Sequence, residues 1–170
     1  MKFLITCLIL CFFSFAQALA EPVEYSDAKL SIKNGDTDAA FMNYLLLSRQ
    51  KEKSTYHQDA LFATAEYYFS IHDFNDAFDT FRNFLEAYPG SSLKPIALFY
   101  LLNISRYWHL EKLIKEIEKE ILNLKRIVLV FKENQEYKIK SPMGRFYAVK
   151  YYIDRVEFHI NGKLQEQILF

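Results

Sequence analysis

A motif that occurs twice along the chain constrains the fold more than any other feature of the sequence. Both copies read Asp, three residues, Ala-Phe, two residues and an aromatic residue; they occupy residues 36–44 and, 37 positions later, residues 73–81. A repeat of about this period is typical of helix–turn–helix units that stack on one another. Since a single unit cannot bury its apolar face alone, the motif predicts several stacked helix pairs.

The shared residues have physical roles in such a unit. Asp36 and Asp73 are suited to accept hydrogen bonds from the free N–H groups of a helix start. Ala28 and Ala65, also 37 residues apart, place a small side chain where two helices would cross. A weaker third unit follows, with its second helix predicted at residues 110–124. The second unit shows one apolar helical face most clearly, at Phe74, Ala77, Phe78, Phe81, Phe84, Leu85 and Tyr88.

Residues 26–124 resemble tetratricopeptide-repeat (TPR) proteins, in particular bacterial periplasmic ones of the BamD and CpoB type. The resemblance rests on AEYYF at residues 65–69, DFNDAF at residues 73–78 and FLEAYPGS at residues 84–91. It implies a short helical solenoid that binds proteins or peptides and performs no chemistry. The third unit matches weakly, and the region after Arg126 matches nothing in that family.

The pattern changes at Arg126, where strand-like segments replace helical spacing. Residues 127–131 are a continuous apolar run and are predicted as a buried strand; residues 145–153 are predicted as another. Residues 156–160 and 163–170 flank Asn161-Gly162, the strongest short signal for a β-hairpin. The predicted fold is therefore α+β. A TPR-like helical domain of about three helix pairs (residues 21–125) precedes a small C-terminal antiparallel β-sheet (residues 126–170).

Residues 1–20 have the layout of a secretory signal peptide: Lys2, an apolar run and small residues that favour cleavage after Ala20. This predicts a periplasmic or secreted protein, with an uncleaved N-terminal anchor as the alternative. Cys7 and Cys11 lie inside the apolar run, a poor context for lipidation. The mature chain would contain no cysteine, so no disulfide could stabilise it.

Charge and motif content argue against several classes of function. The chain has 21 basic and 21 acidic residues; without Lys2 the mature chain has 20 and 21, a net charge of −1, which does not favour nucleic acid. The histidines are single, without a partner at metal-ligand spacing, and no nucleophile motif or glycine-rich phosphate loop occurs. We therefore expect a protein that is not an enzyme and binds no metal or cofactor. The histidines are His57, His72, His109 and His159.

The remaining prediction is a binding groove. In a TPR stack the first helix of each pair lines the concave side, where apolar and charged residues suit an extended or helical peptide. Alternatively, the C-terminal sheet fills this surface. The predicted groove residues are Tyr25, Lys29, Lys33, Phe62, Glu66, Phe69, Leu98, Leu102 and Arg106.

Three classes of function follow from this interpretation. The first is a non-catalytic adaptor of the cell envelope that binds a protein or peptide partner in the groove, compatible with peripheral association with an envelope complex. The second is a periplasmic accessory or inhibitor protein that pairs an edge strand of its β-tail with a partner. The third, which no motif supports, is a hydrolase with an unrecognised site.

Overall fold

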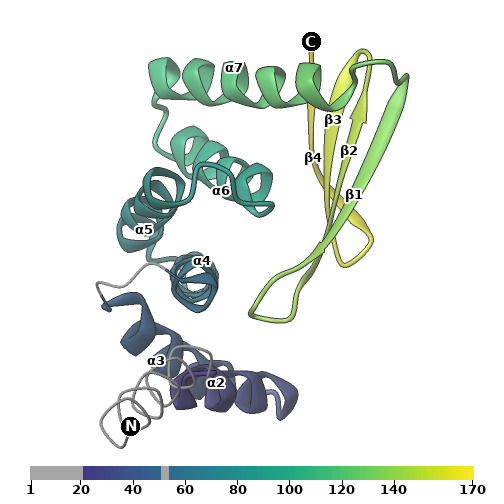
Figure 1. The fold of residues 1–170 in the computed structure, drawn as a ribbon. Helices are drawn as coiled ribbons and strands as arrows, with labels where there is room; N and C mark the ends of the chain where they lie inside the picture. Colours follow the sequence, from purple (N-terminus) through teal and green to yellow (C-terminus); the bar gives the residue numbers. More distant parts are fainter. Residues whose placement is uncertain (1–20, 51–53) are drawn as a thin grey trace, which may run out of the picture.

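The fold is α+β, as predicted: six helices are followed by a four-stranded antiparallel sheet (Figure 1). The computed structural model describes residues 21–50 and 54–170, so the predicted signal peptide lies outside the described residues. None of the six described helices is long and apolar enough to cross a membrane. The helices are α2 (Val23–Lys33), α3 (Thr37–Ser48), α4 (Thr55–Ser70), α5 (Phe74–Ala87), α6 (Lys94–Tyr107) and α7 (Glu111–Val128), and the strands are β1 (Asn134–Lys140), β2 (Phe146–Tyr152), β3 (Arg155–Ile160) and β4 (Lys163–Leu169).

The six helices form three pairs that share one turn geometry. Gly35, His72 and His109 end the first helix of each pair, 37 residues apart, with positive φ angles of 79°, 64° and 56°. In each turn the next amide donates to the carbonyl five residues earlier, at 2.9, 3.0 and 2.9 Å. This is the hydrogen bond that closes a Schellman motif at a helix C-terminus. The period seen in the sequence therefore extends through the third pair.

Helix caps and small buried residues confirm the repeat assignment. The Asp36 and Asp73 carboxylates accept hydrogen bonds from the third amide of the helix that each begins, at 2.9 and 3.3 Å. Both alanines of the duplicated motif are fully buried, which allows the helices to approach closely. The four small residues with no exposed surface at these crossings are Ala28, Ala40, Ala65 and Ala77.

The predicted strand at residues 127–131 is wrong. Helix α7 continues to Val128 and is followed by a turn, and the sheet begins only at Asn134. The buried stripe of α7 continues at four-residue spacing through Ile117, Ile121 and Lys125, which keeps this part of the chain helical. Ile127 lies off that stripe and is 71% exposed, so the apolar run is not a buried strand.

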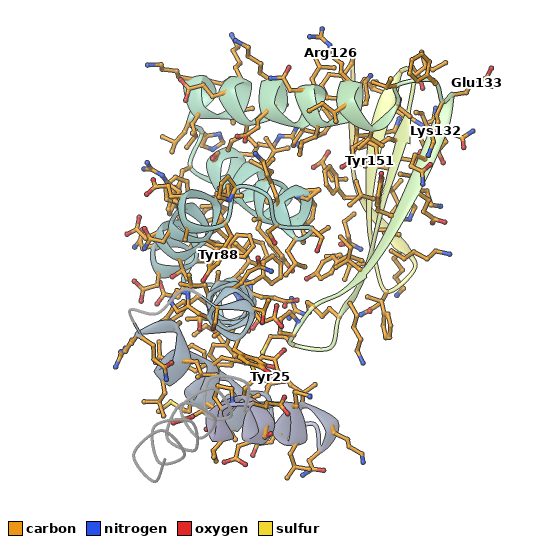
Figure 2. All side chains as sticks on the ribbon, in the orientation of Figure 1. Tyr25, Tyr88, Arg126, Lys132, Glu133 and Tyr151 are labelled. Carbon is orange, nitrogen blue, oxygen red and sulfur yellow. The ribbon has the colours of Figure 1, made fainter. Side chains whose placement is uncertain are left out.

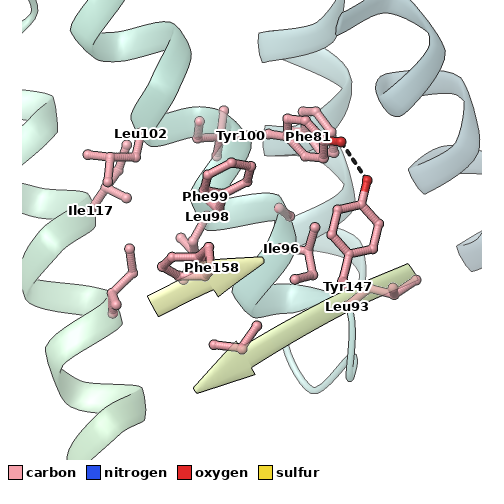
Figure 3. Close-up of a cluster of buried hydrophobic side chains, with 14 of the residues drawn as sticks. Phe81, Leu93, Ile96, Leu98, Phe99, Tyr100, Leu102, Ile117, Tyr147 and Phe158 are labelled. Atoms are coloured by element: carbon pink, nitrogen blue, oxygen red, sulfur yellow. Dashed lines mark hydrogen bonds between the residues drawn. The ribbon is translucent and has the colours of Figure 1, made fainter. Parts of the chain in front are cut away.

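The sheet lies across the concave side of the helices in Figure 1, with strands in the order β1-β2-β3-β4. Strands β2, β3 and β4 confirm the predicted segments, whereas β1 was not predicted. Figure 3 shows the core between the sheet and α6, where the Phe158 and Phe99 rings stack with centroids 5.2 Å apart. The inner face of the sheet contributes Tyr147, Val149, Tyr151, Val156, Phe158 and Ile168 to this core.

The β3–β4 connection is the predicted two-residue turn. Ile160 is paired with Lys163, and the intervening Asn161 and Gly162 have φ angles of 49° and 78°. Both lie in the left-handed region that a type I′ turn requires.

Gly162→Val is expected to destabilise this hairpin by about 1–2 kcal/mol, because a β-branched residue tolerates positive φ poorly. A side chain there would meet no atom within 4 Å, so the cost comes from the backbone. Hydrogen exchange should accelerate at residues 156–170 and stay unchanged in the helices. Gly90→Val is the matched control, since Gly90 has the same open surroundings without positive φ. Equal effects of the two substitutions would contradict the turn assignment.

Candidate functional site

The concave face of the helical stack has a covered part and an open part. The sheet covers it over α6 and the C-terminal half of α4, where polar side chains from both sides meet in a buried network. Near α2 the sheet reaches the helices only through the β1–β2 turn (Figure 1). A pocket remains open between that turn, α2 and α4.

This pocket has a volume of about 720 Å³ and is the candidate functional site. Segments far apart in the sequence form its wall: α2, α3, the start of α4, the loop before α6, and the end of β1 with the β1–β2 turn. Figure 2 shows Tyr25 between α2 and α4. The lining residues are Tyr25, Lys29, Ile32, Lys33, Tyr44, Gln58, Asp59, Ser92, Leu93, Ile139, Lys140, Ser141, Pro142 and Gly144.

Contacts with α2 and α3 fix the position of the β1–β2 turn. The buried Tyr44 hydroxyl donates a hydrogen bond to the Pro142 carbonyl oxygen at 3.2 Å. Gly144 approaches α2 so closely that a Cβ atom there would lie 3.1 Å from Cγ2 of Ile32, and its φ of 83° also favours glycine. The β1–β2 turn is therefore held in place by these contacts and forms one wall of the pocket.

The charged groups of the pocket are mostly basic. Lys29 and Lys33 come from α2. Lys140 lies at the end of β1, but its Nζ is 5.2 Å from the centroid of the exposed Phe146 ring, so its ammonium lies on the outer face of the sheet. Of the two α2 lysines, Lys29 forms an ion pair with Glu21 at 2.9 Å, and Lys33 forms none with the described residues. These two lysines can attract an anionic group.

One carboxylate faces the lysines but is already hydrogen bonded. The Tyr25 hydroxyl donates to Oδ2 of Asp59 at 2.5 Å. Burial raises the pKa of the Asp59 carboxyl, and the hydrogen bond from Tyr25 offsets this only in part. Burial likewise raises the pKa of Tyr25, so the phenol keeps its proton. The pocket thus offers positive charge, hydrogen bonds and an aromatic surface.

The buried network closes the rest of the concave face. Tyr147 donates to Oε1 of Glu66 at 2.5 Å, and its hydroxyl lies 2.5 Å from that of Tyr100, the contact drawn in Figure 3. Nε of Arg145 lies 3.5 Å from the same carboxylate oxygen, and the Arg145 guanidinium also donates to Tyr100 at 3.2 Å. Glu66 is fully buried, and its Oε2 has no hydrogen-bond partner within residues 21–50 and 54–170. Burial raises the pKa of Glu66, and it raises the pKa of Tyr100 to about 12.

The nine predicted groove residues do not form one surface. Tyr25, Lys29 and Lys33 line the pocket, as expected for a concave position. Glu66 is covered by the sheet, and Arg106 forms ion pairs with Glu118 and Glu166 at 3.0 and 2.6 Å. The other four pack within the protein instead of facing a ligand: Phe62, Phe69, Leu98 and Leu102.

Their burial has a physical cause. The Phe62 ring packs edge-on against Phe81 and Phe84 of the neighbouring helix, so it faces α5. Helix α6 is covered by helices on one side and by the sheet on the other, which explains why it is apolar all round and why Leu98 and Leu102 are buried. Counting positions within the repeat could not predict this burial, because the sheet that covers α6 is not part of the repeat.

Two charged pocket residues were missed by the sequence analysis. Asp59 lies two helical turns before Glu66 on the same face of α4, so helical spacing alone could have identified it. Lys140 belongs to the strand that was not predicted, and no pattern in the sequence indicated that the end of this strand would border the pocket.

Comparison with known proteins adds no further assignment: no family model matches the sequence, and no curated protein is similar to it. The resemblance to TPR proteins therefore stays a prediction. Among residues 21–50 and 54–170, no cluster of histidine and acidic side chains is arranged to hold a metal ion. His57 has a structural role instead, since its ring nitrogens contact the Tyr88 hydroxyl at 2.6 Å and the Ser48 carbonyl at 3.2 Å.

Both edges of the sheet carry features that hinder strand pairing. At one edge, β1 alternates charged residues on its exposed face, Glu136, Lys138 and Lys140. At the other edge, β4 contains an irregularity opposite Phe158 and His159. Charged side chains and bulges are common devices that protect edge strands from pairing with another chain. The geometry therefore favours the pocket over the sheet edges as the binding site.

Proposed function

We propose that the protein is a non-catalytic adaptor of the cell envelope, periplasmic or secreted, that binds an extended acidic segment of a protein partner. The observation that carries this proposal is the pocket between α2, α4 and the β1–β2 turn, where Lys29 and Lys33 outnumber one carboxylate, Asp59, that already accepts a hydrogen bond from Tyr25. It retains three of the predicted groove residues. The TPR resemblance supports a binding role, and the predicted signal peptide supports the location.

The pocket suits a peptide because it mixes kinds of contact. Lys29 and Lys33 lie one helical turn apart on α2, so acidic side chains of one bound segment can reach both. Tyr25 and Ile32 offer apolar surface beside them, and backbone groups of the β1–β2 turn offer hydrogen bonds. A pocket of about 720 Å³ holds a few residues of an extended chain.

Selection from a peptide library displayed on phage tests this proposal with the full chain as bait. Selected peptides should be enriched in Asp and Glu, and their affinity should fall at high salt. Lys29→Glu/Lys33→Glu should weaken binding of a selected peptide about tenfold, because two attractions become repulsions. Fluorescence anisotropy of the labelled peptide measures the change.

Lys112→Glu/Lys119→Glu is the matched control, because both lysines are exposed on α7, away from the pocket. This variant changes the net charge equally but should leave peptide affinity unchanged. Enrichment of uncharged peptides, or equal losses in the two double variants, would overturn the proposed site.

A further inference from the structure

Six exposed apolar side chains gather where α7 meets the sheet, at the opposite end of the sheet from the pocket. Their exposed fractions are 71, 53, 102, 70, 69 and 42% in chain order. Scattered apolar residues are ordinary on a protein surface, whereas a contiguous group marks an interaction site. This group, here named the apolar tip, consists of Ile127, Val130, Phe131, Ile153, Leu169 and Phe170.

Contacts of Lys125 and Asp154 join the segments that carry the apolar tip. Nζ of Lys125 donates to the Ile153 carbonyl at 2.7 Å and lies 4.6 Å from the centroid of the Phe170 ring. The Phe170 amide donates to the Asp154 carbonyl at 3.0 Å. The end of α7, the β2–β3 turn and the C-terminal residues therefore form one surface.

Phe131 is the most unusual residue of the apolar tip. Its side chain is fully exposed, and its backbone has a φ of 65°, a conformation that bulky residues rarely adopt. Folding gains nothing from a phenylalanine here, since neither packing nor backbone preference favours it. The same reasoning applies to Ile127, which lies off the buried stripe of α7. Val128 and Leu129 of the apolar run pack against the core, whereas Ile127 and Phe131 have no structural explanation within the described residues.

We propose that the apolar tip inserts into the headgroup region of an anionic lipid bilayer. Arg126 and Lys132 flank Ile127 and Phe131 and are exposed at the same end of the molecule (Figure 2). Nearby, Arg155 forms ion pairs with both Asp154 and Glu157, at 3.0 and 2.8 Å, and Glu133 is the acidic residue next to Lys132. Aromatic side chains beside basic residues favour the membrane interface.

The charges around the apolar tip also favour a bilayer over a second copy of the chain. Phe131 lies next to Lys132 and Ile127 next to Arg126, and two copies would bring these like charges together. A few side chains suffice for interfacial insertion when basic residues add electrostatic attraction. The proposal is independent of the pocket, because the two sites lie at opposite ends of the sheet.

Vesicle flotation with the full chain tests this inference. The unmodified protein should float with phosphatidylcholine vesicles that contain phosphatidylglycerol, and less with phosphatidylcholine alone. Phe131→Asn should lower the partition coefficient at least about tenfold, since one buried aromatic side chain is lost. Asparagine tolerates positive φ, so the fold is retained and the melting temperature should not fall. Arg126→Gln/Lys132→Gln should remove the preference for phosphatidylglycerol.

Leu46→Ser on α3 is the matched control, because Leu46 is 54% exposed and lies outside the apolar tip. All variants share the same N-terminus, so differences between them report on the substituted surface. Equal binding of the unmodified protein and Phe131→Asn would overturn the proposal. So would sedimentation that shows a dimer abolished by Phe131→Asn without any vesicle binding, because a second copy would then be the occupant.

Discussion

Replacing Arg145 with Met is expected to lower the free energy of unfolding by about 3–5 kcal/mol at neutral pH. Arg145 is the basic residue that faces the fully buried Glu66, with Nε 3.5 Å from the carboxylate. Its removal leaves Glu66 with only the Tyr147 hydroxyl for a hydrogen bond. Urea denaturation followed by circular dichroism measures the loss.

The pH dependence of this loss distinguishes charge from packing. Burial raises the pKa of Glu66 above its value in the unfolded chain. The corresponding stabilisation is complete below the unfolded pKa and is lost as pH rises through the folded pKa. Without Arg145 the folded pKa rises further, so acidification should restore part of the stability of Arg145→Met. Glu66→Gln should remove this pH dependence.

Arg82→Met is the matched control, because Arg82 is exposed and its ion pair with Glu86 is 3.6 Å long. Such surface pairs contribute at most about 1 kcal/mol. In a Glu66→Gln background, Arg145→Met should also lower the free energy of unfolding by a smaller amount, because no buried carboxylate is then left without its cation. Equal losses for Arg145→Met and Arg82→Met would show that the buried network does not hold the sheet.

Phe158→Ala is expected to lower the free energy of unfolding by about 3–5 kcal/mol and to weaken the packing of the sheet on the helices. Phe158 is 2% exposed and stacks on Phe99 of α6 with ring centroids 5.2 Å apart. Its removal leaves a cavity in the main contact between β3 and the helical stack. Thermal unfolding measures the loss of stability, and hydrogen exchange should accelerate in all four strands before it does in α4 and α5.

Phe146→Ala is the control on the same sheet, because Phe146 is 59% exposed. Its truncation should change stability by less than about 1 kcal/mol. If Phe158→Ala changed exchange only within β3, the sheet and the helices would not act as one cooperative unit.

The sequence predicted the parts of the fold whose signals are local. The duplicated motif identified the helix pairs because capping aspartates and crossing alanines act within each unit, and Asn161-Gly162 identified a turn for the same reason. The prediction of a strand at residues 127–131 was wrong because apolar, β-branched residues are compatible with a helix end as well as with a buried strand. Strand β1 was missed because both its faces are largely exposed and polar.

The candidate site was predictable only in part, because it joins local and distant segments. Tyr25, Lys29 and Lys33 followed from counting positions within the first unit. The end of β1 and the β1–β2 turn reach the pocket only because the turn is held by the Tyr44 contact with a residue 98 positions later. The left-handed turns at His72 and His109 carried a signal that was overlooked, since Gly35 occupies the equivalent position.

The pairing of Glu66 with the sheet sets an order of events during translation. Ribosomes make the chain from its N-terminus, so the second helix pair is complete before Tyr147, 81 residues beyond Glu66, has been added. Until then the Glu66 carboxylate of the nascent chain stays hydrated, and the inner surface around it is accessible. A cellular chaperone could recognise this part of the surface only in this interval, because the sheet covers it in the folded protein.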